Sequence, residues 1–271
     1  MSFYTSITGL KASQTSLDVI SHNLANAETT GFKKSGTQFA DVITGSSYDN
    51  PRMTTGIGVT VEAIRQNFTL GPIEQTGSAL DMAITGNGFF TTRSEQTGNT
   101  LYTRNGSFNV DGGGFISDGS GNRLQVFPVD ATGAVTSTAT LADAHIPATN
   151  AAGAAFAGAT VDTQGEVTAT YADGTNTVIG VVSLADFVSP TGLKQVGSSN
   201  WEATGLSGTA SYGQPGADQY GGLLSGALER SNVDTTEELV GLITAQRNFQ
   251  ANAKAIDTAT QIGQTIINLR T

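Results

Sequence analysis

The chain has 271 residues, 38% of them hydrophobic, which suffices for a buried core and argues against a disordered protein. A formal net charge of −10 at pH 7 gives no electrostatic support for binding nucleic acid or an anionic membrane, so we expect neither partner. Disulfides and thiolate metal sites are excluded because the chain has no cysteine.

The first thirty residues carry an apolar repeat. Its members, seven positions apart, are Phe3, Leu10, Leu17 and Leu24, with Ile20 and Ala27 in the adjoining positions. This spacing predicts a helix of the coiled-coil type over residues 1–30. The same stretch lacks a basic region followed by an unbroken apolar run, so we expect no cleaved secretory signal, and no segment reaches membrane-spanning length.

Two asparagines, Asn23 and Asn26, interrupt this helix near its end. Buried asparagines fix register in coiled coils, so both could bond to neighbouring chains in an assembly. Alternatively, both face water, and the sequence leaves these two readings open. After Thr30, Gly31 is predicted to end the helix with a positive φ, and Phe32 to anchor the turn.

The middle of the chain, residues 78–230, is predicted to be β-rich. Alternating or apolar runs predict strands at 123–129, 165–171 and 176–184. Hairpins are expected at Asn87-Gly88, at Asn105-Gly106 and from Asp111 to Gly114. The Ala-rich stretch 141–160, in which Pro147 disfavours a helix, is expected to be a low-complexity connection.

A second apolar repeat marks the last segment, residues 231–271. Leu242, Phe249 and Ile256 lie seven positions apart. This spacing predicts a second long helix, capped by Asp234 or Thr235. The predicted fold class is therefore α+β, with the two terminal helices paired as a coiled coil around a β-rich middle.

The two predicted seams are thin, because small or polar residues such as Ser13, Gln246 and Gly263 interrupt them. An isolated helix pair should be marginally stable, and lateral packing against further copies of the chain would supply the missing burial. The residues assigned to self-assembly are Leu10, Leu17, Ile20, Leu24, Asn23, Asn26, Leu239, Leu242, Phe249 and Ile256.

Catalytic, metal and cofactor sites are not expected. His22 and His145 have no evident partner for acid–base chemistry. The stretch from Asp118 to Asn122 has the oxygen spacing of a calcium loop, but Arg123 stands where that loop needs glycine, so a hairpin turn explains it better. The competing function is a glycan-active enzyme or binding module that uses Asp81, Asp111 or Asp118.

Four stretches, in order, resemble the rod and hook proteins of the bacterial flagellum. They are SLDVISHNLANAETTGFKKSGTQFADV, ALDMAITGNGFF, YTRNGSFNVDGGGFI and GALERSNVDTTEELVGLITAQRNFQANAKAI. The opening and closing stretches are most similar to hook proteins, in a short form without the outer inserted domain. The total length is that of a distal rod protein, which is the alternative.

The resemblance implies a non-enzymatic subunit of a tubular polymer, exported without a cleaved signal to the hook and basal body. The paired helices would line the export channel, and residues 31–77 would be an extended connecting segment. Phe39 and Ile43, in FADVI, match a recognition pattern of the flagellar type III export gate; alternatively, they pack against the helix pair. The other implied partners are copies of the chain itself, the distal rod protein, the hook cap and the hook–filament junction protein.

Overall fold

The computed structural model describes residues 3–43, 56–130, 133–138, 140–217 and 219–268. The chain divides into two compact units. The helical unit comprises residues 1–27, 34–67 and 233–271, and the β unit comprises residues 28–33 and 68–232. Two terminal helices and a β-rich middle confirm the predicted α+β class.

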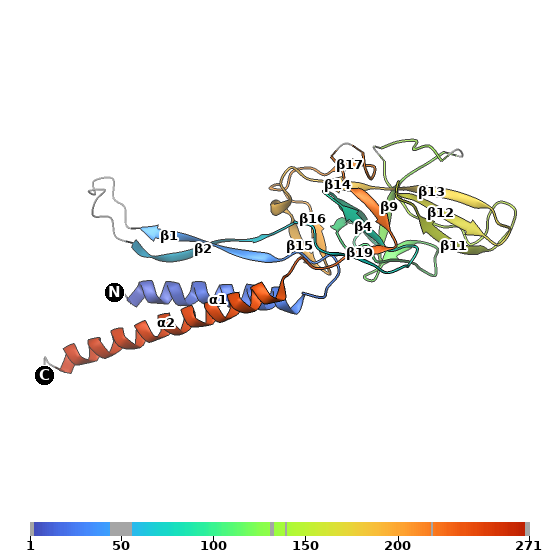
Figure 1. Cartoon of the computed structure of the whole chain (residues 1–271). Coiled ribbons are helices and arrows are strands. Elements are labelled where there is room, and N and C mark those ends of the chain that lie inside the picture. The colour runs from blue at the N-terminus through green and yellow to red at the C-terminus, as the bar shows by residue number, and fades with distance from the viewer. Residues whose placement is uncertain (1–2, 44–55, 131–132, 139, 218, 269–271) are drawn as a thin grey trace. The chain divides into compact units, whose positions relative to one another are not determined.

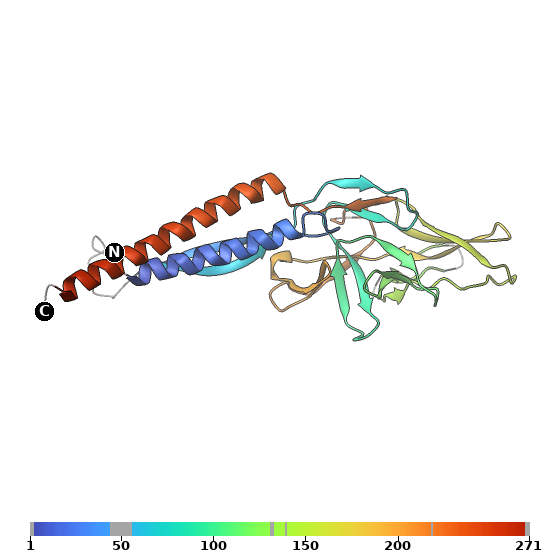
Figure 2. The same cartoon turned by 90° about the horizontal axis from the view of Figure 1, so that it is seen from below.

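The helical unit contains two helices and a two-stranded antiparallel sheet. Its elements are α1 (Phe3–Ala25), β1 (Ser35–Ile43), β2 (Gly56–Gln66) and α2 (Thr235–Asn268). Figures 1 and 2 both show α1 and α2 side by side and antiparallel. Accordingly, a Cβ on Gly9 would lie 2.8 Å from the Asn252 side chain, and one on Gly241 would lie 3.5 Å from Ile20.

The start of α2 follows from its capping residue. Asp234 Oδ1 accepts the backbone N–H groups of Thr236 at 2.8 Å and Glu237 at 3.2 Å, so two otherwise unpaired donors of the first turn are satisfied. Asp234 is therefore the cap, one of the two residues proposed from the sequence. The helix begins at the next residue.

The β unit contains the remaining strands. They are β3 (Ile73–Gln75), β4 (Met82–Thr85), β5 (Phe89–Ser94), β6 (Thr100–Thr103), β7 (Phe108–Val110), β8 (Ile116–Asp118), β9 (Asn122–Phe127), β10 (Ala142–Asp143), β11 (Phe156–Val161), β12 (Glu166–Tyr171), β13 (Asn176–Val182), β14 (Leu184–Asp186), β15 (Lys194–Gly197), β16 (Asn200–Glu202), β17 (Ser211–Gly213), β18 (Gly222–Ser225) and β19 (Ala227–Glu229), with a short 3-10 helix at Pro190–Gly192.

Most of these strands belong to one large sheet, whose main path is β11-β12-β13-β9-β5-β6-β16-β15. The pairs β18-β4 and β19-β3 form two small sheets. Strand β12 explains why sequence alternation predicted a strand here. Its buried and half-buried residues alternate strictly, because successive side chains of a pleated strand point to opposite faces of the sheet. The strands predicted at 123–129, 165–171 and 176–184 are confirmed by β9, β12, and β13 with β14.

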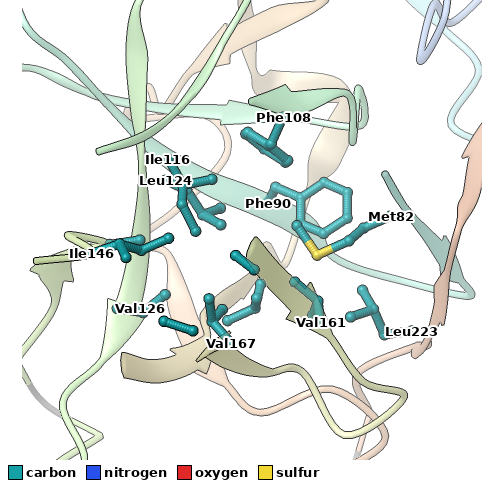
Figure 3. Packing of buried hydrophobic residues seen from close by; sticks show 14 of the residues in the cluster. Met82, Phe90, Phe108, Ile116, Leu124, Val126, Ile146, Val161, Val167 and Leu223 are labelled. Atoms are coloured by element: carbon teal, nitrogen blue, oxygen red, sulfur yellow. The ribbon is translucent and has the colours of Figure 1, made fainter. Parts of the chain in front are cut away.

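Two clusters of buried side chains form the core of the β unit. Figure 3 shows the larger one, in which Phe90 meets Phe108 edge to face at 5.7 Å between ring centroids. The smaller cluster surrounds Trp201, with Phe89 and Phe187 among its members. Phe90 and Trp201 are both completely buried.

A repeated turn motif connects several strands: an Asp or Asn followed three residues later by Gly. The side-chain Oδ1 accepts the backbone N–H groups two and four residues ahead at 2.8 to 3.0 Å. The glycine has a φ of 79 to 83°, which side-chain-bearing residues adopt at a cost. The pairs are Asp111 and Gly114, Asp118 and Gly121, Asn150 and Gly153, and Asp162 and Gly165.

Two of the three expected hairpins are wrong. The turn from Asp111 to Gly114 joins the paired strands β7 and β8, but strands flanking Asn87-Gly88 and Asn105-Gly106 pair elsewhere. Gly106 serves close backbone approach instead, since a Cβ there would lie 1.7 Å from the Met82 carbonyl oxygen, whereas Gly88 has a φ of 120°. The Ala-rich stretch is likewise more than a connection, since it contributes β10, part of β11 and the buried residue Ile146.

Candidate functional site

The helix surfaces assigned to self-assembly are incompletely buried. On α1, Leu10, Leu17, Ile20 and Leu24 are all half-buried. The fully buried residues of this helix are instead small or polar, namely Ser6, Ala12, Ser13 and Asn23. The helices lie together as expected, but coiled-coil packing of the predicted seam stays a prediction.

On α2 the apolar residues are even less covered. Leu242, Phe249 and Ile256 are half-buried, whereas Leu239 is 47% exposed. Val240 and Ile243, which the heptad reading did not single out, are 61% and 50% exposed. Among the described residues of the helical unit, the buried apolar side chains are two alanines, Ala12 and Ala245.

A groove of about 450 Å³ lies among the two helices, β1 and β2. Small side chains such as Gly9, Ala12 and Ala245 line it, together with Phe39 and Val59. Strand β2 is tied to α1 here, because Thr8 Oγ1 accepts the Val59 N–H at 3.3 Å. Ser13, Ser16, Asn248 and Asn252 also line the groove, so its surface is mixed apolar and polar.

Asn23 is neither exposed to water nor available to another chain. It is 1% exposed, its Nδ2 donates to the Ser35 carbonyl at 2.8 Å, and its Oδ1 accepts the Ser35 N–H at 2.9 Å. Nδ2 also lies 3.2 Å from the Glu238 carboxylate. Both readings offered from the sequence are thus wrong for Asn23, because its side chain joins α1, the first residue of β1 and α2 within one chain.

Asn26 differs from Asn23. Its Nδ2 donates to the His22 carbonyl one turn earlier at 2.9 Å, and the residue is half-buried. Helix α1 ends at Ala25, so Asn26 lies in the turn that follows. Its side chain therefore completes the end of the helix.

The turn after α1 contains Thr30, Gly31 and Phe32. Gly31 has the predicted positive φ, 67°, but lies several residues beyond the helix end. A Cβ there would come within 2.4 Å of the Asn105 backbone nitrogen, so close approach also requires glycine. Phe32 is 3% exposed, and the Thr30 carbonyl accepts a hydrogen bond from Ser199.

Phe39 and Ile43, the predicted export signal, both lie on β1. Phe39 is 44% exposed and lines the groove beside the helices, whereas Ile43 is 56% exposed. The packing alternative therefore describes Phe39 in part. Recognition by an export gate stays a prediction for both residues.

A buried ion cluster in the β unit was missed in the sequence. Lys33 Nζ lies 2.5 Å from Glu229 Oε1, and Arg104 Nη1 lies 3.4 Å from Glu229 Oε2. All three side chains are at most 3% exposed. Glu229 Oε1 also accepts the Gly71 N–H at 2.8 Å, and Lys33 donates to the Thr69 carbonyl at 2.7 Å.

This cluster fastens three segments at which the chain leaves or enters the β unit: residues 28–33, the stretch after 68 and the stretch before 232. Burial lowers the pKa of Lys33, and the Glu229 carboxylate offsets part of that effect. Burial also lowers the pKa of Arg104, opposed by Glu229 and by Asp186. No sequence pattern links partners 196 residues apart, so only the fold reveals them.

The carboxylates of the competing glycan hypothesis serve local structure. Asp111 and Asp118 cap the hairpin turns described above, and Asp81 accepts a hydrogen bond from Thr76 at 2.5 Å. His22 is exposed, and the His145 ring lies tilted against the Phe115 ring, with 4.7 Å between the centroids. The three carboxylates thus each have a role in local structure. Neither α1 nor α2, over the residues described, is long and apolar enough to cross a membrane.

Three protein-family models match the chain. Residues 3–33 match "Flagella basal body rod protein", residues 83–169 match "Flagellar hook protein FlgE/F/G D1 domain", and residues 224–269 match "Flagellar basal body rod FlgEFG protein C-terminal". All three describe rod or hook proteins of the bacterial flagellum. The class suggested by the four sequence stretches is therefore confirmed.

Similar proteins cover the chain almost completely. The basal-body rod protein FlgG of Bacillus subtilis is 34% identical, over 99% of this chain and 98% of its own length. FlgG of Agrobacterium fabrum is 33% identical, over 96% and 95%. The hook protein FlgE of Salmonella typhimurium is 28% identical over the full length of both chains. The chain therefore belongs to the flagellar rod and hook protein family.

Proposed function

We propose that this chain is a structural, non-enzymatic subunit that polymerises into the tubular flagellar hook. The observation that carries the proposal is the burial of the helical unit. Its described apolar residues, apart from Ala12 and Ala245, stay half-buried or exposed in one chain. A helix pair with this little core gains stability when further copies cover its apolar residues.

The choice of hook over distal rod rests on the terminal stretches, which are most similar to hook proteins. The length of the chain supports the alternative. The alignment with FlgG of Bacillus subtilis spans 280 residues, close to the 271 of this chain, whereas the alignment with FlgE of Salmonella typhimurium spans 411. Deleting the gene and imaging the flagellum tests the choice. Loss of the hook with an intact rod is expected, and loss of the distal rod would overturn it.

The mechanical role follows from the side chains involved. Interdigitated apolar side chains of α1 and α2 from many copies would resist twisting, because sliding would expose them. Weakly charged β surfaces would slide past one another with few ion pairs to break, which lets a tube bend while it transmits torque. The helices would line the export channel, and Phe39 with Ile43 would be read by the type III export gate before folding.

Hook position implies further neighbours for the polymer. The distal rod protein would lie at its base, the hook cap at its growing end, and the hook–filament junction protein at its finished end. Each contact is a proposal that follows from the family. The contact between copies of the chain itself is the one that the exposed helix residues support directly.

Assembly can be tested with single charged substitutions in the helices. Leu17→Asp and Phe249→Asp should each block polymerisation of the purified chain, measured by sedimentation and electron microscopy. Gln14→Asp and Gln250→Asp add the same charge at exposed positions of the same helices and should leave assembly intact. Fluorescence of Trp201 should stay unchanged in all four variants. Normal tubes from both Leu17→Asp and Phe249→Asp would overturn the assignment.

A further inference from the structure

Two apolar side chains stand exposed on neighbouring loops of the β unit. Val188 is 95% exposed and Leu206 is 83% exposed, more than any other large apolar residue in the described part of the chain. Val188 directly follows the buried Phe187, and Leu206 directly precedes the buried Ser207. Large aliphatic groups lose hydrophobic stabilisation in such positions, so their exposure needs a reason.

Hydrogen bonds hold the two loops together. Ser189 N–H donates to the Ser207 carbonyl at 3.3 Å, and Thr204 Oγ1 donates to the Gly192 carbonyl at 2.6 Å. A Cβ on Gly192 would lie 2.6 Å from the Leu206 carbonyl carbon, so the loops touch directly. The two exposed side chains are therefore presented by one fixed projection, which we call the 188/206 knob.

The knob is anchored to the core. Phe187 packs in the cluster around Trp201, with ring centroids of Phe187 and Tyr102 4.8 Å apart. A surface that is already ordered loses little conformational entropy when it binds. Rigid support and exposed apolar groups are the properties of a binding surface rather than of a solvated loop.

The charge around the knob indicates what it binds. The two loops that form the knob, residues 187–193 and 204–212, contain no charged side chain, although Asp186, Lys194 and Glu202 border them and the whole chain has a net charge of −10. Two copies of such a chain repel each other unless they meet through neutral surfaces. A strongly basic or acidic partner would instead be recognised by loops that carry the opposite charge, and these two loops carry none.

We propose that the 188/206 knob docks on a different surface of a second copy of this chain. This inference rests on the proposed function and adds a contact of the β unit to those of the helices. A contact between two different surfaces can repeat without closing, as a tube requires, whereas a knob-to-knob contact would close into a dimer. The knob therefore contributes to the lateral contacts of the polymer.

The test uses the absence of cysteine, which makes an introduced thiol unique. Leu206→Cys carries a polarity-sensitive maleimide dye, and Thr163→Cys carries the same dye on an exposed turn of the same unit. Mixed at low ratio with unlabelled chain, the dye at position 206 should shift to the blue as the chain assembles, and the dye at 163 should not. In parallel, Leu206→Asp should raise the concentration needed for assembly about tenfold to a hundredfold, whereas Thr163→Asp should leave it unchanged.

The outcomes separate this inference from the proposed function. If wild-type chains assemble while the dye at 206 stays in water and Leu206→Asp assembles normally, the knob is no contact and the proposed function stands. If wild-type chains do not assemble at any concentration, both fall. If a photo-crosslinker at position 206 captures a different protein but no copy of the chain in assembled flagella, the second copy is the wrong occupant.

Discussion

In the β unit, large side chains such as Phe90, Leu124 and the single tryptophan are completely buried, whereas in the helical unit the described buried apolar residues are Ala12 and Ala245. The β unit forms its core from strands that pair among themselves. The helical unit also contains large apolar residues but covers them only partly. We therefore expect the β unit to be stabilised by its own core, and the helical unit to depend on the further copies of the chain that the proposed function supplies.

The largest expected difference between the units comes from removing a large side chain in each. Phe90→Ala empties a completely buried position beside Phe108 and should lower the free energy of unfolding of the β unit by about 4 kcal/mol. Leu17→Ala, at a half-buried position of α1, should change it by less than about 0.5 kcal/mol. Urea unfolding followed by Trp201 fluorescence reports the β unit, because Trp201 is the only tryptophan.

Circular dichroism at a helix-sensitive wavelength is the second measurement, because its signal reports the folding of α1 and α2. Phe90→Ala should leave the helix signal of the folded chain unchanged. If Leu17→Ala lowered the stability reported by Trp201 as much as Phe90→Ala does, the two units would share one core. The contrast between them would then be lost.

The ion cluster should produce the next largest effect. Glu229→Gln leaves Lys33 and Arg104 buried without their shared carboxylate and should cost about 3 kcal/mol in the same urea assay. Lys33→Met keeps the apolar stem and leaves Arg104 and Glu229 as a balanced pair, so it should cost about 1 kcal/mol, mainly for the lost hydrogen bond to the Thr69 carbonyl, which still accepts from Asn232 Nδ2.

The larger loss expected for Glu229→Gln than for Lys33→Met tests whether the balance of charges stabilises the cluster. Two cations share one carboxylate, so removing the carboxylate must be worse than removing either cation. Equal losses for Glu229→Gln and Lys33→Met would indicate that the cluster acts through packing alone. Arg104→Met offers a further check, because it also removes the guanidinium that lies 5.2 Å from the Phe89 ring centroid.

The sequence predicted the elements whose signals are local. Each of these signals depends on residues close together in the sequence. They are the heptad repeats of α1 and α2, the Asp234 cap, the alternation along β12 and the turn that begins at Asp111. The glycine at 31 was predicted to have a positive φ and does. The extended segment 31–77 proved to contain β1, β2 and β3, because extended backbone pairs when a partner strand is near.

Signals that depend on distant partners could not be predicted. Gly106 looked like a hairpin glycine, but its role is close approach to Met82, which is remote in sequence. Lys33 and Glu229 have no motif that announces their pairing. For Asn23 the sequence left contact between chains and exposure to water both open, because its in-chain partners, Ser35 and Glu238, become visible only when β1 and α2 are folded beside α1.

Asn23 gives the most local prediction, because its effect is confined to one hydrogen bond of the helical unit. Replacing it with alanine removes the acceptor of the Ser35 N–H, which bonds to Asn23 Oδ1 at 2.9 Å. Local opening at Ser35 should become easier by about 1.4 kcal/mol, a tenfold faster amide exchange. Hydrogen–deuterium exchange of the unassembled chain measures this directly, while the Trp201 unfolding curve should not move.

Asn26→Ala is the matched control, because it removes a second asparagine amide three residues away, which donates to the His22 carbonyl of α1. It should leave exchange at Ser35 unchanged. Unchanged exchange in Asn23→Ala as well would show that pairing with β2, and not the Asn23 bond, holds β1 in place. If Asn23→Ala also made amide exchange faster in the β unit, the contrast between the two units would fail. A substitution in the helical unit would then weaken the core of the β unit, which should be stable by itself.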